Sequence, residues 1–417
     1  MQKFHDKTDI NAKKYLTGSS FIDYRTQPRA YKTYPAFFLT FDIDEYPELK
    51  FIKNIGKITA SKEYGKTKVD LRANPSAGGL YPNEIYIQLR GIKGLLSGIY
   101  HYMPLENKIC LIHELSNDGV EFYFEEKSQK NIIILLSCAY FRTVWKYENR
   151  AIRYLLLDTG HQLGSIYASF VLEDLDFNID FNFLKEALNK DFSFDAFESF
   201  YVSVINQKHK ELNPKKLRSP IVNVSACDYQ LKDEFVEEFY SVSNKNSFPN
   251  ISNIGLLEHL DKENLQKAVD NRRSIRAFKK ESIYINDFLF IVNDIFNFAQ
   301  KYNIEIYFIN HRVEGLKKGL YKNVDLIKES DFEQIATKLA LNQKLGGDSA
   351  VTFIFTSKDV DNYFYLYILT GFISQILYLK STYLNISCSG LGAYFDNITK
   401  EFLDTSNNIF YLLAVGK

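Results

Sequence analysis

An internal repeat constrains the fold of this chain more than any other feature. The segment EIYIQLRGIKGLLSGIY (84–100) aligns without a gap with EIYFINHRVEGLKKGLY (305–321), at a constant offset of 221 residues. Seven of the 17 positions are identical, whereas chance gives about one, and such self-similarity indicates two copies of one structural unit. Each copy has large alternating residues, a glycine turn and a second Gly-x-Tyr run, which predicts a β-hairpin.

The stretches after each copy also correspond. Both NIIILLSCAYF (131–141) and SAVTFIFTS (349–357) are short apolar runs that predict buried strands. Long buried helices are predicted for 150–172 and 363–384, where apolar residues recur three and four positions apart. We therefore expect an α+β protein with two tandem domains, each a mostly antiparallel sheet flanked by helices. The two domains should pack as a pseudo-dimer inside one chain, around a pseudo-twofold axis.

A polar, proline-containing segment at residues 206–250 separates the two copies. We place an N-terminal half at residues 1–220, a linker at 221–250 and a C-terminal half at 251–417.

Composition limits the partners and the compartment. Lys plus Arg and Asp plus Glu both number 51 in the 417 residues, so net charge gives no case for nucleic acid or an acidic membrane surface. The four cysteines are far apart and include no CxxC pair, which predicts free thiols and no metal site. The polar N-terminus does not resemble a signal peptide, and no run reaches the ~18 apolar residues of a membrane span. We expect a cytoplasmic protein.

Three motifs distinguish the halves. The first half has Pro75-Ser76-Ala77-Gly78-Gly79, whose small residues allow the backbone to approach something flat or anionic. The second half has NRRSIRAF (271–278), with forked donors suited to a phosphate, and CSGLGAYF (388–395), where backbone N–H groups can approach a ligand. A solvated arginine-rich face and an ordinary turn are the alternatives for the last two motifs. Because each half lacks what the other has, we expect a site between them.

Together these motifs resemble a known family. NRRSIRAF, the GLG turn after a long helix and the terminal GK look like the FMN-dependent nitroreductase fold. More specifically, LRANPSAGGLYPNEIYI, GIYHYMP and KYENRAIRYLLLDTGHQLGSIYAS resemble SagB-type azoline peptide dehydrogenases, in their tandem two-domain form. The resemblance extends over nearly the whole chain.

The resemblance implies a single composite FMN site per chain, with the pseudo-symmetric second site empty. The implied contacts fall into three groups. The phosphate would be bound by Arg272, Arg273, Ser274, Arg276 and Lys417, the ring would lie beside Gly390, Leu391 and Gly392, and the first half would cover it with Pro75, Ser76, Ala77 and Gly78.

The same resemblance implies a catalytic role for Lys146 and Tyr147. Proton removal from carbon needs a base, and Lys146 would serve if burial or Arg150 and Arg153 lowered its pKa, with Tyr147 sharing or orienting the proton. The alternative is a surface lysine beside a core tyrosine. A helix also places Asp158 and His161 on one side, where they could hydrogen-bond, although a structural histidine is the favoured interpretation.

We also consider that residues 100–102, Tyr-His-Tyr, line or underlie the substrate mouth, with ordinary hairpin packing as the alternative.

The leading functional hypothesis is an FMN-dependent dehydrogenase that converts an azoline to an azole in a modified peptide, with oxygen as the electron acceptor. The alternatives are an NAD(P)H-dependent reductase of nitro groups, quinones or dehydroamino acids, and a flavin-binding scaffold subunit without turnover. Expected partners are a peptide or small-molecule substrate and a cyclodehydratase complex, and a higher oligomer is compatible with the sequence.

Overall fold

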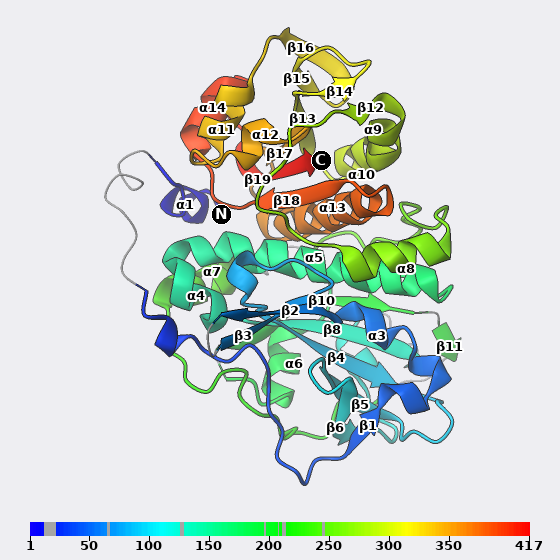
Figure 1. The fold of residues 1–417 in the computed structure, drawn as a ribbon. Helices are drawn as coiled ribbons and strands as arrows, with labels where there is room; N and C mark the ends of the chain where they lie inside the picture. Colours follow the sequence, from blue (N-terminus) through cyan, green and yellow to red (C-terminus); the bar gives the residue numbers. More distant parts are fainter. Residues whose placement is uncertain are drawn as a thin grey trace.

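Two antiparallel sheets enclose a pair of long helices, in the order sheet, helix, helix, sheet (Figure 1). The computed structural model describes residues 1–11, 22–64, 67–125, 129–195, 197–206, 208–210, 214–243 and 247–417. Each large sheet is built from one half of the chain, and both central helices lie between the sheets. This confirms the predicted α+β fold class with two tandem units.

The first sheet has the strand order β1-β6-β5-β4-β8-β10-β9. Its strands are β1 Thr40–Asp42, β4 Asn83–Leu89, β5 Gly98–Met103, β6 Lys108–Glu114, β8 Ile132–Ala139, β9 Asn178–Asp180 and β10 Glu198–Ile205. The second sheet has the order β16-β15-β13-β17-β19-β18. Its strands are β13 Glu305–Asn310, β15 Gly319–Lys322, β16 Asp325–Glu329, β17 Val351–Ser357, β18 Ser387–Leu391 and β19 Asn408–Gly416.

Helices and short strand pairs surround the two sheets. The helices are α1 Gln2–Lys7, α3 Ile52–Ile55, α4 Phe141–Tyr147, α5 Ala151–Leu172, α6 Lys185–Asp191, α7 Glu234–Ser243, α8 Lys262–Asn271, α9 Ile285–Val292, α10 Ile295–Lys301, α11 Glu333–Leu339, α12 Leu345–Asp348, α13 Tyr363–Tyr383 and α14 Asp396–Leu403. The strand pairs are β2 Ile58–Tyr64 with β3 Thr67–Arg72, β7 Gln129–Lys130 with β11 Lys208–Lys210, and β12 Ile283–Tyr284 with β14 Val313–Glu314.

Side chains alternate between the two faces of each strand, and this explains why one core extends through both halves. In β4, Ile85 and Ile87 join the central core, whereas Tyr86 faces a smaller cluster on the outer side of its sheet. In β13, Ile306 joins the same central core and Tyr307 faces outward. Successive strand residues point to opposite faces, so each sheet presents an apolar face to the paired helices.

Two glycines set how closely the central helices cross. A Cβ atom on Gly160 of α5 would overlap the carbonyl oxygen of Ile368, and one on Gly371 of α13 would overlap that of Leu157. Both glycines follow a threonine, Thr159 and Thr370. The crossing therefore falls at equivalent positions of the two copies, as a pseudo-twofold axis requires.

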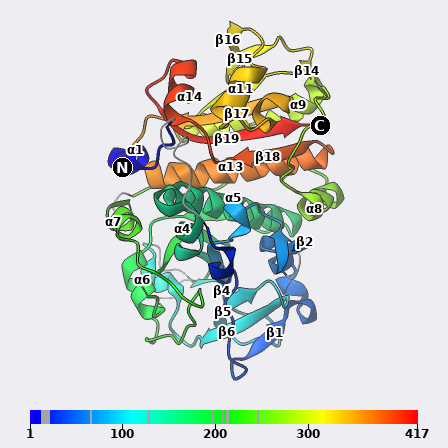
Figure 2. The same cartoon turned by 60° about the vertical axis from the view of Figure 1, so that its left-hand side comes forward.

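The N-terminal helix α1 lies against the second half, beside α13 (Figure 2). The Nδ1 atom of His5 is 3.2 Å from the hydroxyl of Tyr363, and Asn408 donates to the Oε1 atom of Gln2 at 2.8 Å. Among the described residues, no helix has both the length and the apolar character needed to cross a membrane. The proposed linker at 221–250 contains α7, and the division at residues 220 and 250 stays a prediction.

Candidate functional site

The small-residue turn of the first half is anchored to the central helix α5 by a buried carboxylate. Ser76 donates through its hydroxyl to Asp158 at 2.5 Å, and the Ala77 N–H donates to the same carboxylate at 3.1 Å. Ser76 in turn accepts the Tyr81 N–H at 2.9 Å. Gly78 and Gly79 follow with φ of 65° and 68°, a left-handed conformation that favours glycine. The turn is therefore fixed at its start, and its tip has a conformation that glycine adopts without strain.

Asp158 is an unusual residue for the position it occupies. It is 3% exposed within an otherwise mostly apolar helix. Burial raises its pKa to about 7, while the hydrogen bonds from Ser76 and Ala77 act in the opposite direction. Its charge therefore changes near neutral pH, directly beneath the turn.

The two predicted catalytic residues lie at the tip of this turn. A Cβ atom on Gly78 would be 2.8 Å from the Tyr147 hydroxyl and 3.2 Å from the Lys146 Nζ atom. Both side chains come from the end of α4 and are partly exposed. Burial raises the pKa of the Tyr147 phenol, and Arg276 opposes that shift. The structure thus brings together residues that are almost 70 positions apart in sequence.

Buried Arg142 fixes α4 relative to the turn. Its guanidinium donates to the Arg29 and Tyr81 carbonyls, both at 2.9 Å, and pairs with Glu84 at 2.5 Å. Burial alone would raise the pKa of Glu84, but Arg142 and His101 hold it well below its usual range. Because Tyr81 closes the small-residue turn, this network holds the turn and α4 in one arrangement.

The turn containing Gly392 meets the first half through two tyrosines. Tyr154 donates to the Gly392 carbonyl at 3.2 Å, and its ring lies so close that a Cβ atom on Gly392 would be 2.6 Å from it. The rings of Tyr154 and Tyr147 meet edge to face with centroids 4.6 Å apart. Gly78 and Gly392, one from each half, are therefore connected through Tyr147 and Tyr154.

The first two arginines of RRSIR contact the first half. Arg272, 3% exposed, donates to the carbonyls of Ala73 at 2.6 Å and Arg72 at 3.0 Å, directly before the turn. Arg273 donates to the hydroxyl of Thr59 at 2.8 Å and to its carbonyl at 2.5 Å. Burial lowers the pKa of both guanidinium groups. These arginines join the two halves.

Ser274 and Gly390 bind the same tyrosine. The Ser274 hydroxyl is 2.8 Å from that of Tyr378, which also accepts the Gly390 N–H at 2.6 Å. The space beside Gly390 is filled by Tyr411, whose hydroxyl a Cβ atom would overlap. Leu391 is buried in β18. These donors, predicted to face the cofactor, are thus engaged within the protein.

Two cations of the predicted phosphate group reach solvent. Arg276 is exposed, and it is close enough to Tyr147 to affect the pKa of that phenol. Lys417 is partly exposed, with its Nζ atom 5.9 Å from the centre of the Tyr284 ring. Neither position tests a phosphate contact, so the cofactor roles stay predictions.

Some buried polar atoms where the two halves meet have no hydrogen-bond partner. Of the fifteen such atoms in the described part of the chain, six lie here: Arg72 Nε, Asn74 Oδ1, His161 Nδ1, Gln162 Oε1, Arg272 Nη1 and Gln375 Oε1. Buried polar atoms are nearly always partnered, so Arg72 Nε and Arg272 Nη1 are donors still available to a ligand. The small void between Arg72 and Asp158 has no space for a water molecule, however. The two arginine nitrogens fit an anionic cofactor group, whereas the three amide oxygens are acceptors and do not. Tyr411 and Tyr154 fill the space beside Gly390 and Gly392, where the cofactor ring was expected.

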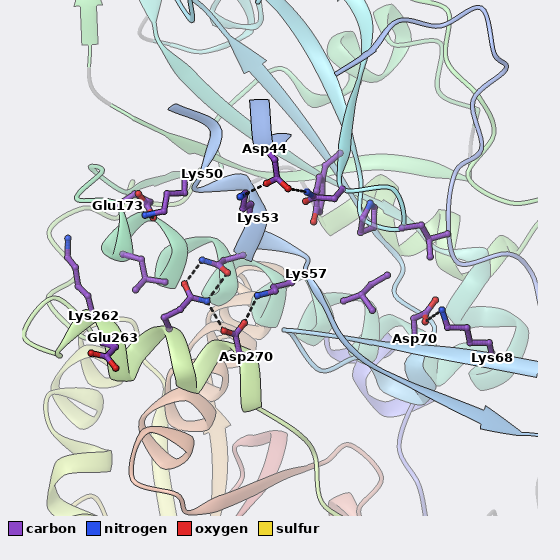
Figure 3. Close-up of a pocket in the computed structure, with 18 residues that line it drawn as sticks. Asp44, Lys50, Lys53, Lys57, Lys68, Asp70, Glu173, Lys262, Glu263 and Asp270 are labelled. Atoms are coloured by element: carbon purple, nitrogen blue, oxygen red, sulfur yellow. Dashed lines mark hydrogen bonds and ion pairs between the residues drawn. The ribbon is translucent and has the colours of Figure 1, made fainter. Parts of the chain in front are cut away.

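A larger groove of about 860 Å³ lies elsewhere along the seam, between α3, α8 and the β2–β3 hairpin (Figure 3). It has five lysines, each in an ion pair with a carboxylate: Lys50–Glu173, Lys53–Asp44, Lys57–Asp270, Lys68–Asp70 and Lys262–Asp174. Asn54 and Gln266 exchange hydrogen bonds across the halves. The neutralised charges make this groove a poor phosphate site, despite its volume.

Two further sequence expectations concern the β5 strand and the helix α5. Tyr100, His101 and Tyr102 are at most 3% exposed in β5, where His101 bonds to Glu84 at 2.9 Å. Tyr100 and Tyr102 belong to the central core, and Tyr102 also lines the larger groove, so their place beneath a substrate mouth stays a prediction. Asp158 bonds to the small-residue turn and not to His161. His161 lies 3.4 Å from the Tyr411 hydroxyl, and burial lowers its pKa to about 3, which agrees with the favoured interpretation of a structural histidine.

One cluster of possible metal ligands occurs among the described residues. Ligand atoms of His5, Asp9 and Asp396 lie within 4.8 Å of one another. Arg153 pairs with both carboxylates at 2.5 Å, and Arg150 pairs with Asp396 at 3.0 Å. The guanidinium groups neutralise the carboxylates, so the cluster anchors the N-terminal helix.

Comparisons with known proteins agree with the fold. The structure of a "putative nitroreductase" from Anabaena variabilis matches with a TM-score of 0.82 and 23% identity, covering 100% of this chain and 99% of that chain. A 99-residue stretch is 32% identical to a "putative nitroreductase" of Methanocaldococcus jannaschii, covering 22% of this chain and 49% of that protein. Another 89 residues are 30% identical to indigoidine synthase of Streptomyces lavendulae, covering 21% of this chain and 6% of that protein.

The chain therefore has the tandem nitroreductase-like fold over its full length. The matched stretch spans about half of the archaeal relative and a small part of the synthase. No protein-family model matches the sequence.

Several residues at the seam were not anticipated. Arg142, Tyr154, Tyr378 and Tyr411 come from apolar or unremarkable segments, and their partners are far away in sequence. The position of Asp158 could have been found, since a carboxylate inside a buried helix needs nearby donors.

Proposed function

We propose that the protein is an FMN-dependent oxidoreductase of the SagB type that oxidises an azoline to an azole in a modified peptide. One observation supports this most: the Gly78 tip is in contact range of both Lys146 and Tyr147. The second half fixes that turn through the bonds from Arg272 to Ala73 and Arg72. A site built from both halves is the arrangement the proposal needs.

In this proposal, Arg272, Arg276 and Lys417 bind the FMN phosphate. Arg272 retains a free Nη1 donor in the described structure, and the other two cations reach solvent. Ser274 and Gly390 can contribute only if Tyr378 releases them. The segment Pro75 to Gly78 covers the ring.

The oxidation removes one hydride and one proton from the substrate. FMN supplies the hydride acceptor when bound, and oxygen takes up the two electrons. Lys146 Nζ accepts the proton, with the Tyr147 hydroxyl orienting it beside Gly78. The anchored turn and the Arg142 network keep these groups at fixed positions, which proton transfer requires.

Flavin content and two variants test the proposal. The purified protein should be yellow and release FMN on denaturation. Loss of one charge-assisted contact costs about 1.5 to 3 kcal/mol, so Arg276→Ala should bind FMN roughly 10- to 150-fold more weakly, while the exposed Arg218→Ala control keeps it. Lys146→Ala should keep FMN and lose turnover, with Lys50→Ala as its control. A colourless wild-type protein refutes the proposal.

A second candidate is an NAD(P)H-dependent reductase of nitro groups, quinones or dehydroamino acids. The names of two of the similar proteins favour it. Bleaching of the bound flavin by NAD(P)H without oxygen would support this candidate.

A scaffold subunit without turnover is the third candidate. It predicts that Lys146→Ala leaves the activity of a peptide-modifying complex intact, whereas loss of FMN abolishes that activity. A cyclodehydratase is the partner that azole formation would require.

A further inference from the structure

An exposed aromatic ring lies directly beside Lys146. Tyr24 begins a short 3-10 turn, Tyr24–Thr26, and is 62% exposed. The Lys146 Nζ atom is 5.4 Å from the centre of its ring, within the range of a cation–π contact. The Trp145 ring meets Tyr24 edge to face, with centroids 5.9 Å apart at 73°. Tyr24 thus contacts both the candidate catalytic lysine and the Trp145 ring.

The turn that carries this exposed ring is held in place from several sides. The Asp23 side chain caps the turn by accepting the Arg25 N–H at 3.0 Å. The Trp145 indole donates to the Thr26 hydroxyl at 3.0 Å, and the Tyr229 hydroxyl donates to the Thr26 carbonyl. Contacts therefore reach Thr26 from α4 and from the segment between the halves. A fixed aromatic side chain offers contact area at low entropic cost.

We propose that Tyr24 and Trp145 form a subsite that binds a flat heterocyclic ring of the peptide, next to Lys146. This inference rests on the proposed function and adds the group by which the substrate is recognised. A flat ring can contact both side chains with the offset or edge-to-face geometry that aromatic pairs adopt. Such a pair contributes about 0.5 to 1.5 kcal/mol beyond area burial. Binding there brings the ring beside the Lys146 amine.

The chain contains its own probe for this subsite, because Trp145 is the single tryptophan in the sequence. The holoprotein is titrated with a short synthetic peptide that carries a thiazole ring and with the same peptide carrying alanine instead. We expect the thiazole peptide to change Trp145 emission in a saturable way and to bind several-fold more tightly. Calorimetric titration of the same pairs gives the affinities independently of any quenching by flavin.

Substitutions at Tyr24 separate the subsite from general surface effects. Tyr24→Ala should weaken binding of the thiazole peptide about 2- to 13-fold, the range equivalent to the pair energy above, and leave the alanine peptide unchanged. Tyr24→Phe keeps the ring and should bind nearly as wild type. Phe37→Ala is the matched control, since Phe37 is also an exposed aromatic residue, at 78%, and packs on Phe38 instead.

The outcomes distinguish this inference from the proposed function. Equal binding of both peptides by the wild type, or equal losses in Tyr24→Ala and Phe37→Ala, overturns the subsite. If the protein also holds FMN and turns over, the proposed function stands without it. A flavin-free protein that still prefers the thiazole peptide through Tyr24 supports the subsite and refutes the flavin proposal.

Discussion

Two neighbouring glycines allow a closely controlled test of the site. Gly78 and Gly79 have nearly the same backbone conformation, with φ of 65° and 68°. Alanine at either position incurs the same left-handed strain, about 1 to 2 kcal/mol. Their surroundings differ. A Cβ atom on Gly78 would be 2.8 Å from the Tyr147 hydroxyl, whereas one on Gly79 has no described atom within 4 Å.

The expected loss of turnover in Gly78→Ala follows from the contact with Tyr147. To reach an ordinary separation of 3.4 Å, the Tyr147 hydroxyl must retreat by about 0.6 Å, and Lys146 must also give way. A misplacement of about 1 Å can cost 10²-fold in rate. We therefore expect Gly78→Ala to lower turnover by about tenfold or more, and Gly79→Ala by about twofold at most. Both variants should lose about the same stability.

The assay compares turnover, FMN content and urea unfolding for the two variants and the wild type. Equal unfolding midpoints with unequal turnover would show that the contact, and not the backbone strain, is responsible. Equal turnover losses in both variants would refute a role for Lys146 and Tyr147 at the turn. Full activity in Gly78→Ala would refute it as well.

Further predictions concern stability. The pKa of Asp158 is raised to about 7, so the folded protein binds more protons than the unfolded chain between pH ~4 and ~7, and stability should fall as the pH rises through this range, by at most about 4 kcal/mol. Asp158→Asn should remove that component, which urea unfolding at pH 5 and 8 would measure, and an unchanged pH dependence would contradict it. Gly160→Ala forces α5 and α13 apart, so it should lower the free energy of unfolding by at least the ~1 to 3 kcal/mol that overpacking a core costs. Equal unfolding midpoints for Gly160→Ala and wild type would mean that the two helices can move apart at their crossing without cost.

Much of the fold was predictable because its signals are local. The repeated hairpins at 84–100 and 305–321 and the long apolar helices carry their periodicity in neighbouring residues. The crossing of those helices was less accessible, since Gly160 is needed only when Gly371 lies opposite it. The burial of the hairpin residues around His101 was also less accessible, because sequence periodicity does not reveal which segments pack over a strand.

For the candidate site, the sequence indicated residues whose roles stay predictions, and it did not reveal their partners. The small-residue turn and Lys146–Tyr147 do meet, yet the anchor of the turn, Asp158, is 82 positions from Ser76. Arg272 was expected at a phosphate, and it bonds to backbone carbonyls of the other half. A sequence motif indicates which chemical groups are present. The hydrogen bonds formed between the two halves decide which of those groups remain available to a ligand.

The unequal halves have a consequence for how this protein can change. In a symmetric homodimer, every substitution appears twice, so an alteration that benefits one interface position is copied to its mirror image. Here Gly78 occurs once per molecule and so does Arg272. Each side of the shared boundary can be altered on its own, which lets a tandem chain explore asymmetric surfaces that identical subunits cannot form.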